Sequence, residues 1–162
     1  LFANGLLIGI DSLPILHTET KREEFNEFIT QLQKRVKFIR SYGEQLPFQD
    51  EIFNTVVCNN VIDHCQRPNL VVQEAYRVLK PQGYIILGVN CFSIIGLLKW
   101  RLYTTKRFAK SANVLAHPHN YLDKGVVKII RKAGFEICAM NQVSMRKRVI
   151  GHQYRLYLIA RK

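Results

Sequence analysis

Four polar side chains capable of chemistry lie within six positions of one another: Asn59, Asn60, Asp63 and His64. His64 or Asp63 could take a proton from a hydroxyl group, and an imidazole is the better match near neutral pH. The two asparagines offer amide groups to a bound polar molecule. The alternative is that Asp63 and His64 cap the helix that follows or bond the loop backbone. The sequence leaves both interpretations open.

This cluster directly follows residues 54–58 (NTVVC), a β-branched run typical of a buried strand. Residues 84–89 (YIILGV) predict a second strand. Between them, apolar residues recur at helical spacing, and Pro81 and Gly83 then end the predicted helix. Two strands joined by a helix form a right-handed parallel unit, in which ligands bind beyond the carboxyl ends of the strands. The polar cluster is therefore expected at the functional edge of the sheet.

Asp11 stands at the end of another predicted buried strand, residues 6–10 (LLIGI). In doubly wound nucleotide-binding folds, an acidic residue at the end of the second strand accepts hydrogen bonds from ribose hydroxyls. The alternative is a turn cap, because Asp-Ser-x-Pro is also turn chemistry. A helix with a capping box at residues 20–23 and a strand at 36–40 are predicted next.

A family resemblance follows from four segments in order: LPFQDEIFNTVV, NNVIDHCQRP, EAYRVLKPQGY and HPHNYLDKGVVKIIRKAGFEI. Together they resemble the class I S-adenosylmethionine-dependent methyltransferases that act on small molecules, across nearly the whole chain. Two positions depart from the pattern: Asn54 replaces an aspartate, and Gln82 replaces the first glycine of the turn. The resemblance implies an α/β fold with a Rossmann-like, mostly parallel sheet and an antiparallel C-terminal hairpin.

The resemblance also assigns roles to individual residues. It places Asp11 on the ribose of S-adenosyl-L-methionine. Tyr42 occupies the position of the family's adenine-binding aspartate, so that contact moves to Gly43 and Glu44. Asn59 and Asn60 are expected to contact the amino acid moiety of the cofactor or the substrate. His64 and Asp63 remain the candidates for a catalytic base.

One family feature is missing from the sequence. The nine glycines form no G-x-G anywhere, so the glycine-rich turn after the family's first strand is absent from these 162 residues. We therefore expect the C-terminal part of a methyltransferase domain, without the first strand and first helix. Such a chain loses the backbone amides that hold the methionine end of the cofactor. Calorimetry should accordingly detect weak binding of S-adenosylmethionine or none.

The C-terminal half predicts a helix at residues 123–132 and two antiparallel strands at 135–140 and 154–160. We expect residues 1–162 to form one domain, with 91–122 as a substrate lid. Residues 94–110 are apolar, then basic and aromatic, which also permits contact with a membrane surface. No transmembrane segment is expected. His117 and His119 have a spacing seen in metal sites, but without nearby cysteine or carboxylate ligands no metal is expected.

The composition limits the function further. The formal net charge of +12 permits a nucleic acid or another acidic partner, and four cysteines without C-x-x-C spacing favour reduced thiols in a cytoplasmic protein. The sequence thus predicts methyl transfer to a small molecule by the complete protein, this chain alone being inactive. One alternative is an RNA methyltransferase, suggested by the charge and by residues 146–148 (RKR), although no N-P-P-Y motif is present. Another is a non-catalytic, degenerate domain.

Overall fold

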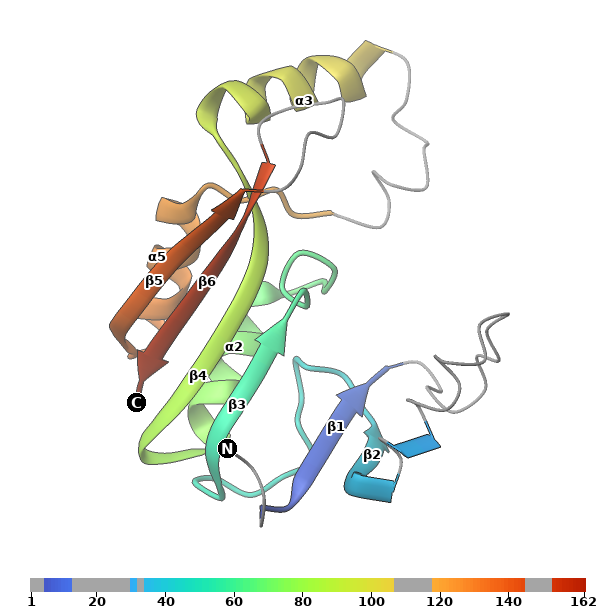
Figure 1. Ribbon diagram of the computed structural model, residues 1–162, viewed down its shortest axis with the longest axis vertical. Coiled ribbons are helices and arrows are strands. Elements are labelled where there is room, and N and C mark those ends of the chain that lie inside the picture. The colour runs from blue at the N-terminus through green and yellow to red at the C-terminus, as the bar shows by residue number, and fades with distance from the viewer. Residues whose placement is uncertain (1–4, 13–29, 32–33, 107–117, 145–152) are drawn as a thin grey trace.

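The computed structural model describes residues 5–12, 30–31, 34–106, 118–144 and 153–162 (Figure 1). The helix predicted from residue 20, His117 and the connection at 145–152 lie outside these residues. The described helices and strands follow one another in this order: β1 (Leu7–Asp11), β2 (Val36–Arg40), β3 (Phe53–Asn59), α2 (Pro68–Val78), β4 (Leu79–Phe92), α3 (Ile94–Lys106), α5 (Asp123–Lys132), β5 (Glu136–Ser144) and β6 (Gln153–Arg161).

The unit β3–α2–β4 is the predicted parallel crossover. Pro68 stands in the first turn of α2, where its missing N–H group costs nothing. The apolar face of α2 packs on the sheet through four buried residues, Val71, Val72, Ala75 and Val78. β4 begins immediately after the helix, and its pairing with β3 jumps from Leu79 to Tyr84. Pro81 and Gly83 therefore lie in an irregular segment of β4, where the sequence predicted a turn outside the strand.

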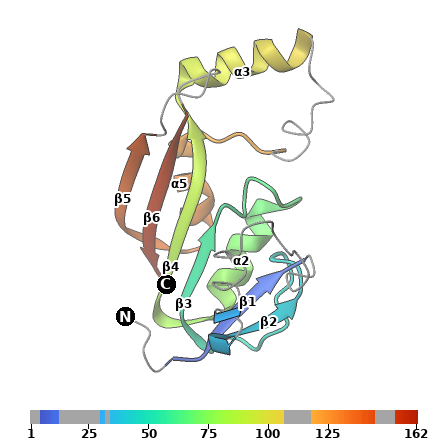
Figure 2. The same ribbon diagram turned by 45° about the vertical axis from the view of Figure 1, so that its right-hand side comes forward.

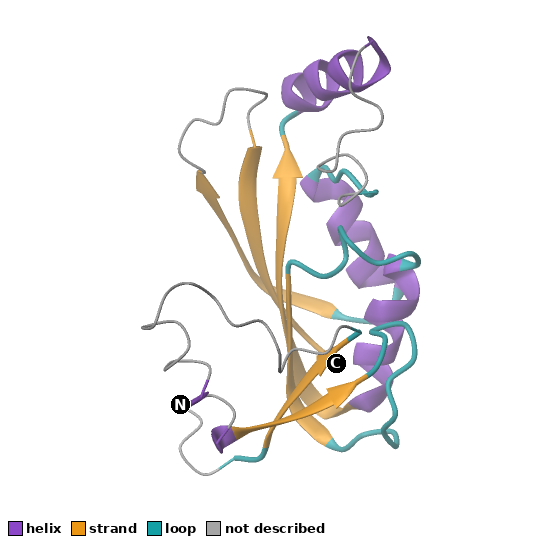
Figure 3. Ribbon diagram, turned by 90° about the vertical axis from the view of Figure 1, so that its right-hand side faces the viewer, coloured by secondary structure: helices purple, strands orange, loops and turns teal. Residues whose placement is uncertain are grey.

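Four strands form a mixed sheet in the order β3-β4-β6-β5. β3 and β4 are parallel, whereas β6 is antiparallel to both β4 and β5. The antiparallel C-terminal pair and the α/β class predicted from the sequence are thus confirmed. Figure 3 shows α2 and α5 on the same face of this sheet. Buried residues of both helices and of β4 and β6 form the core, including Ile85, Leu87, Val126, Ile130 and Leu158.

β1 and β2 form a separate parallel pair, in which Asp11 is opposite Arg40. Within the described part of the chain, β1 and β3 belong to different sheets. Even so, both strands point toward the same end of the molecule (Figures 1 and 2). The carboxyl ends that carry Asp11 and Asn59 therefore face the same way, as expected for one functional edge.

α3 follows β4 and lies beyond the carboxyl end of that strand (Figure 1). Four of its apolar side chains are 57–68% exposed: Ile94, Ile95, Leu98 and Leu102. Such a row of exposed apolar residues is unusual on a helix that has no further role. Within the described ranges, α3 and the other helices are too short or too polar to cross a bilayer.

The irregular segment of β4 that carries Gln82 yields a first prediction. Gln82 has a φ of 65°, in the left-handed region where a side chain is strained. Gln82→Gly should raise the free energy of unfolding by about 0.5–1 kcal/mol, measured by urea denaturation. Gln73→Gly is the control, because Gln73 is exposed in α2, where glycine should destabilise by about 1 kcal/mol. If both changes altered the free energy of unfolding equally, the backbone at Gln82 would not be strained.

Candidate functional site

The end of β3 is shaped by its contact with β4. Asn59 extends over Gly88, and a Cβ atom at Gly88 would overlap the Oδ1 of Asn59. Asn60 follows with a φ of 58°, a left-handed conformation that asparagine tolerates better than most residues. Its N–H donates to the carbonyl of Gly88 at 2.7 Å. Glycine at position 88 thus lets both asparagines turn across the carboxyl ends of the strands.

A chain of side-chain hydrogen bonds crosses this edge. Arg155 Nε donates to Asn90 Oδ1 at 3.3 Å, and Asn90 Nδ2 donates to Asn60 Oδ1 at 2.9 Å. Asn60 Nδ2 in turn lies 2.9 Å from His64 Nε2. The chain joins β6, β4, the end of β3 and the turn after it. It fixes the His64 ring relative to the sheet.

Asp63 lies next to His64 but is buried, with 1% of its surface exposed. Its Oδ2 is 3.7 Å from His64 Nε2. The turn that holds both residues is closed by the N–H groups of His64 and Cys65, which donate to the Val61 carbonyl at 3.0 and 3.1 Å. The structure therefore brings Asn59, Asn60, Asp63 and His64 together, as the sequence predicted.

The second group of predicted residues surrounds the end of β1. Asp11 is exposed there, and its backbone carbonyl accepts a hydrogen bond from Ser41 N–H at 3.0 Å. Ser41 Oγ donates to the Gln45 carbonyl at 3.0 Å, which closes the loop containing Gly43 and Glu44. The loop predicted to contact adenine is thus fixed beside Asp11.

Glu44 also has a structural role that the sequence analysis missed. Its Oε1 accepts hydrogen bonds from the backbone N–H groups of Gln66 and Arg67, at 3.0 and 3.2 Å. These two residues immediately precede α2, so the carboxylate supports the start of that helix. Gly43 lies against the same helix, since a Cβ there would be 3.4 Å from Val71. The loop after β2 is therefore fastened to the helix between β3 and β4.

Asn90 and Arg155 were not identified from the sequence. Asn90 lies near the carboxyl end of β4, so the rule that placed Asn59 at the edge could have found it. Arg155 has no such signal, because it lies in an antiparallel strand and is one of 24 lysines and arginines.

His119 contacts a backbone carbonyl and an aromatic ring of the protein itself. Its Nε2 lies 3.0 Å from the carbonyl of Cys65, and its ring stacks on Tyr121 at 6.1 Å between centroids. Tyr121 itself donates to the Ile62 carbonyl at 3.2 Å, and burial raises its pKa. His119 and Tyr121 thus support the turn that carries His64. Across the described ranges, no group of three or more potential metal ligands occurs.

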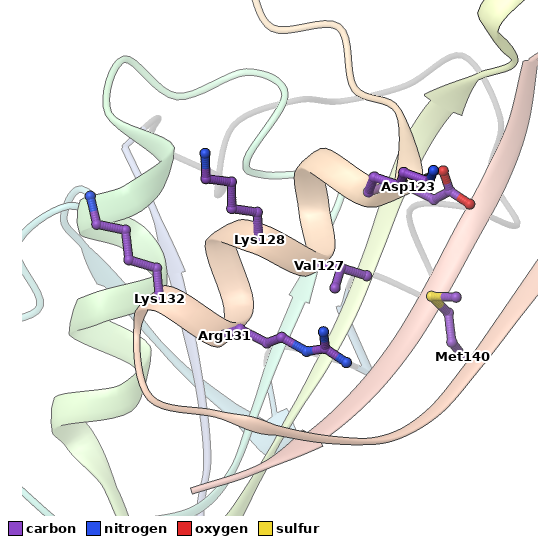
Figure 4. Close-up of a pocket in the computed structure, with 7 residues that line it drawn as sticks. Asp123, Val127, Lys128, Arg131, Lys132 and Met140 are labelled. Atoms are coloured by element: carbon purple, nitrogen blue, oxygen red, sulfur yellow. Dashed lines mark hydrogen bonds between the residues drawn. The ribbon is translucent and has the colours of Figure 1, made fainter.

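A groove of about 780 Å³ lies elsewhere, between α5 and β5. Figure 4 shows Val127 and Arg131 on α5 and Met140 opposite them. Lys124, Lys128 and Lys132 also line it, together with one acidic residue, Asp123. None of the predicted site residues lines this groove.

The cysteines yield a second prediction. Burial raises the pKa of Cys58 and of Cys91 to about 12, whereas Cys138 is exposed. Because the thiolate is the reactive form, iodoacetamide at pH 8 should modify Cys138 quickly. Cys58 and Cys91 should react only after unfolding in urea. Mass spectrometry of timed samples measures this order, and rapid labelling of either buried thiol would contradict it.

Comparisons with known proteins agree with this geometry. A family model described as "Methyltransferase domain" matches residues 4–87, more than half of the chain. An uncharacterised protein of Methanocaldococcus jannaschii is 32% identical over 105 residues, covering 64% of this chain and 48% of that protein. A ubiquinone/menaquinone biosynthesis C-methyltransferase of Brucella anthropi is 29% identical over 119 residues, covering 65% and 45%. The chain thus spans about half the length of these relatives.

The fold is also that of solved methyltransferases. A SAM-dependent methyltransferase of Methanosarcina mazei aligns with 96% of this chain and 81% of its own, at a TM-score of 0.67 and 18% identity. The family match begins just before β1, which ends at Asp11, and continues through the turn with His64 into β4. The chain therefore belongs to the methyltransferase domain family, and it has the fold of an S-adenosylmethionine-dependent methyltransferase.

Proposed function

We propose that the protein transfers a methyl group from S-adenosyl-L-methionine to a small-molecule acceptor. The observation that carries this proposal is the common direction of β1 and β3, which turns Asp11 and the polar residues after β3 toward the same end of the molecule (Figures 1 and 2). In α/β sheets, this edge is where nucleotide-like ligands bind.

The residues present fit the adenosine half of the cofactor. The exposed carboxylate of Asp11 suits two ribose hydroxyls, and the fixed loop with Gly43 and Glu44 lies beside it. Asn59 and Asn60 offer amides to the amino acid moiety. The sulfonium group supplies an activated methyl, so the protein has mainly to align the acceptor and exclude water.

His64 and Asp63 are our candidates for the residues beside the nucleophile of the acceptor. The hydrogen-bond chain through Asn60 and Asn90 holds the His64 ring in place, which favours a defined approach of the acceptor. The four free cysteines fit a cytoplasmic protein. Within a single domain, we assign residues 91–122 to the substrate lid.

The exposed apolar row on α3 supports an apolar acceptor. The Brucella anthropi relative is named for quinone biosynthesis, and a quinone ring with a hydrocarbon tail has this character. Together, Ile94→Ser, Leu98→Ser and Leu102→Ser should raise KM for such an acceptor by about tenfold or more. The melting temperature should change little, because these side chains are 57–68% exposed. Steady-state kinetics with a short-chain quinol measures the effect.

The matched control is Met140→Ser with Val143→Ser, since these apolar residues of β5 are 49% and 46% exposed. The control should leave KM unchanged. An equal rise in KM in both variant proteins would contradict the assignment of α3 to the substrate lid. A loss of binding to anionic vesicles, with KM unchanged for a soluble acceptor, would instead assign α3 to a membrane surface.

The function itself is tested with the protein in the longest form that its gene encodes. Incubation with tritium-labelled S-adenosylmethionine and a set of phenols and quinols should label an organic-soluble product. Label incorporated into tRNA or rRNA, with a steep dependence on salt, would support the RNA methyltransferase suggested by the net charge of +12. Cofactor binding without transfer to any acceptor would favour the degenerate domain.

A further inference from the structure

The hydrogen-bond chain from Arg155 to His64 has only one consistent direction. A guanidinium group can only donate, so the side-chain atom of Asn90 that faces Arg155 must be its oxygen, at 3.3 Å. The amide nitrogen of Asn90 then faces Asn60 and donates to its oxygen at 2.9 Å. In turn, the nitrogen of Asn60 faces His64. Arg155 thus sets the orientation of both amides.

The last bond of the chain fixes the protonation of the imidazole. Asn60 Nδ2 lies 2.9 Å from His64 Nε2, and a donor at this distance requires the nitrogen to accept. His64 Nε2 must therefore carry a lone pair, which leaves the ring proton on Nδ1.

Asp63 is the group that opposes this arrangement. A carboxylate near Nε2 would favour a proton there, but Oδ2 of Asp63 is 3.7 Å away, beyond hydrogen-bond distance. The Asn60 amide is 0.8 Å closer, by subtraction of the two distances. The nearer donor therefore decides which nitrogen holds the proton.

We propose that Arg155 is a positioning residue that, through Asn90 and Asn60, holds His64 as the neutral tautomer with its proton on Nδ1. In this state the Nδ1–H group of His64 donates a hydrogen bond to an oxygen of the methyl acceptor. Nε2 already accepts a hydrogen bond from Asn60, so it does not remove a proton from the methyl acceptor. The acceptor class that such a donor suits carries an anionic or strongly accepting oxygen, such as an enolate or a phenolate. Only this last step depends on the proposed methyl transfer.

The test is imidazole ¹⁵N nuclear magnetic resonance of the full chain at pH 8.5, where the neutral ring can be observed. Long-range ¹H–¹⁵N spectra distinguish a protonated from an unprotonated ring nitrogen. The wild type should show the proton of His64 on Nδ1. Arg155→Met should shift the ratio of the two tautomers by about tenfold toward Nε2–H, the size expected for the loss of one hydrogen bond. Arg155→Lys should retain the wild-type signal, because lysine also only donates.

Asn90→Asp should reverse the orientation of the Asn60 amide and with it the tautomer of His64. A carboxylate at this position can only accept, so Asn60 must turn its nitrogen toward position 90 and its oxygen toward His64. The Nε2–H tautomer should then predominate. Arg161→Met is the matched control, because Arg161 also lies in β6 but pairs with Glu136 at 2.7 Å. It should leave the His64 signals unchanged.

A wild-type proton on Nε2, or a tautomer that Asn90→Asp leaves unchanged, would overturn the inference. Methylation assays with a series of phenols then test the proposed donor contact separately. Arg155→Met should lower kcat severalfold with little change in KM for S-adenosylmethionine. The expected tautomers without any methylation would contradict the proposed function but leave the role of Arg155 intact.

Discussion

Arg77→Met should lower the free energy of unfolding by about 3 kcal/mol, the cost of removing one partner from a partly buried polar network. The guanidinium of Arg77 holds Glu74 on α2 with two donors, at 2.7 and 2.8 Å. It also donates to the carbonyls of Leu46 and Phe48 and to the carboxylate of Asp50, at 3.1, 2.7 and 2.7 Å. Methionine would remove the Arg77 donors from the part-buried carbonyls of Leu46 and Phe48 and from Glu74, which would keep only its bond from the Leu46 N–H at 2.8 Å. Urea denaturation followed by circular dichroism measures the loss.

Arg131→Met is the control, because Arg131 is an exposed arginine in α5. Its effect should stay within about 0.5 kcal/mol. Arg77→Lys should retain part of the stability, since lysine keeps the charge but cannot form the paired contacts with Glu74. If Arg77→Met and Arg131→Met cost the same, the network does not stabilise the fold.

The same network predicts how stability depends on pH. The hydrogen bond from Arg77 lowers the pKa of Glu74 from 4.5. A carboxyl group with a lowered pKa in the folded state stabilises the protein above its unfolded pKa and loses that contribution as the pH falls through the folded value. The difference in stability between wild type and Arg77→Met should therefore shrink in acid.

The sequence was sufficient for elements with strong local signals. β2 and α5 have the predicted limits, because a β-branched run and a strict apolar period define them. The predicted start of β4 was wrong by five residues, because the strand begins at Leu79 and not at Tyr84. Pro81 and Gly83 locally favour a turn, but Leu79 already pairs with Phe53, so the strand includes them. The separation of β1 from β3 depends on pairing between strands that are distant in the chain, and no local sequence pattern reports such pairing.

For the candidate site too, the sequence was sufficient only where the residues are neighbours in the chain. Asn59, Asn60, Asp63 and His64 were found because they are neighbours after one strand. Arg155 could not be found, because its role depends on the antiparallel register that places it opposite Asn90, 65 positions away. The second role of Glu44 was hidden for the same reason, since its partners at the start of α2 are 22 and 23 positions away.

Asp11→Ala should weaken the binding of S-adenosylhomocysteine by about 10- to 100-fold, because hydrogen bonds to a charged group contribute about 1.5–3 kcal/mol. The carboxylate is exposed at the end of β1, and the neighbouring loop is tied to its backbone by the Ser41 hydrogen bond at 3.0 Å. The backbone bond should survive the change. Isothermal titration calorimetry on the longest form of the protein measures the loss.

The control for Asp11 is Glu136→Gln. Glu136 is an exposed carboxylate at the amino end of β5, and β5 runs in the same direction as β4 because both are antiparallel to β6. It therefore lies at the opposite edge of the molecule from Asp11 and should not affect affinity. Asp11→Asn should fall between wild type and Asp11→Ala, since an amide oxygen still accepts but carries no charge. Equal affinities for all four proteins would remove Asp11 from the cofactor site, and with it the argument that the ends of β1 and β3 act together.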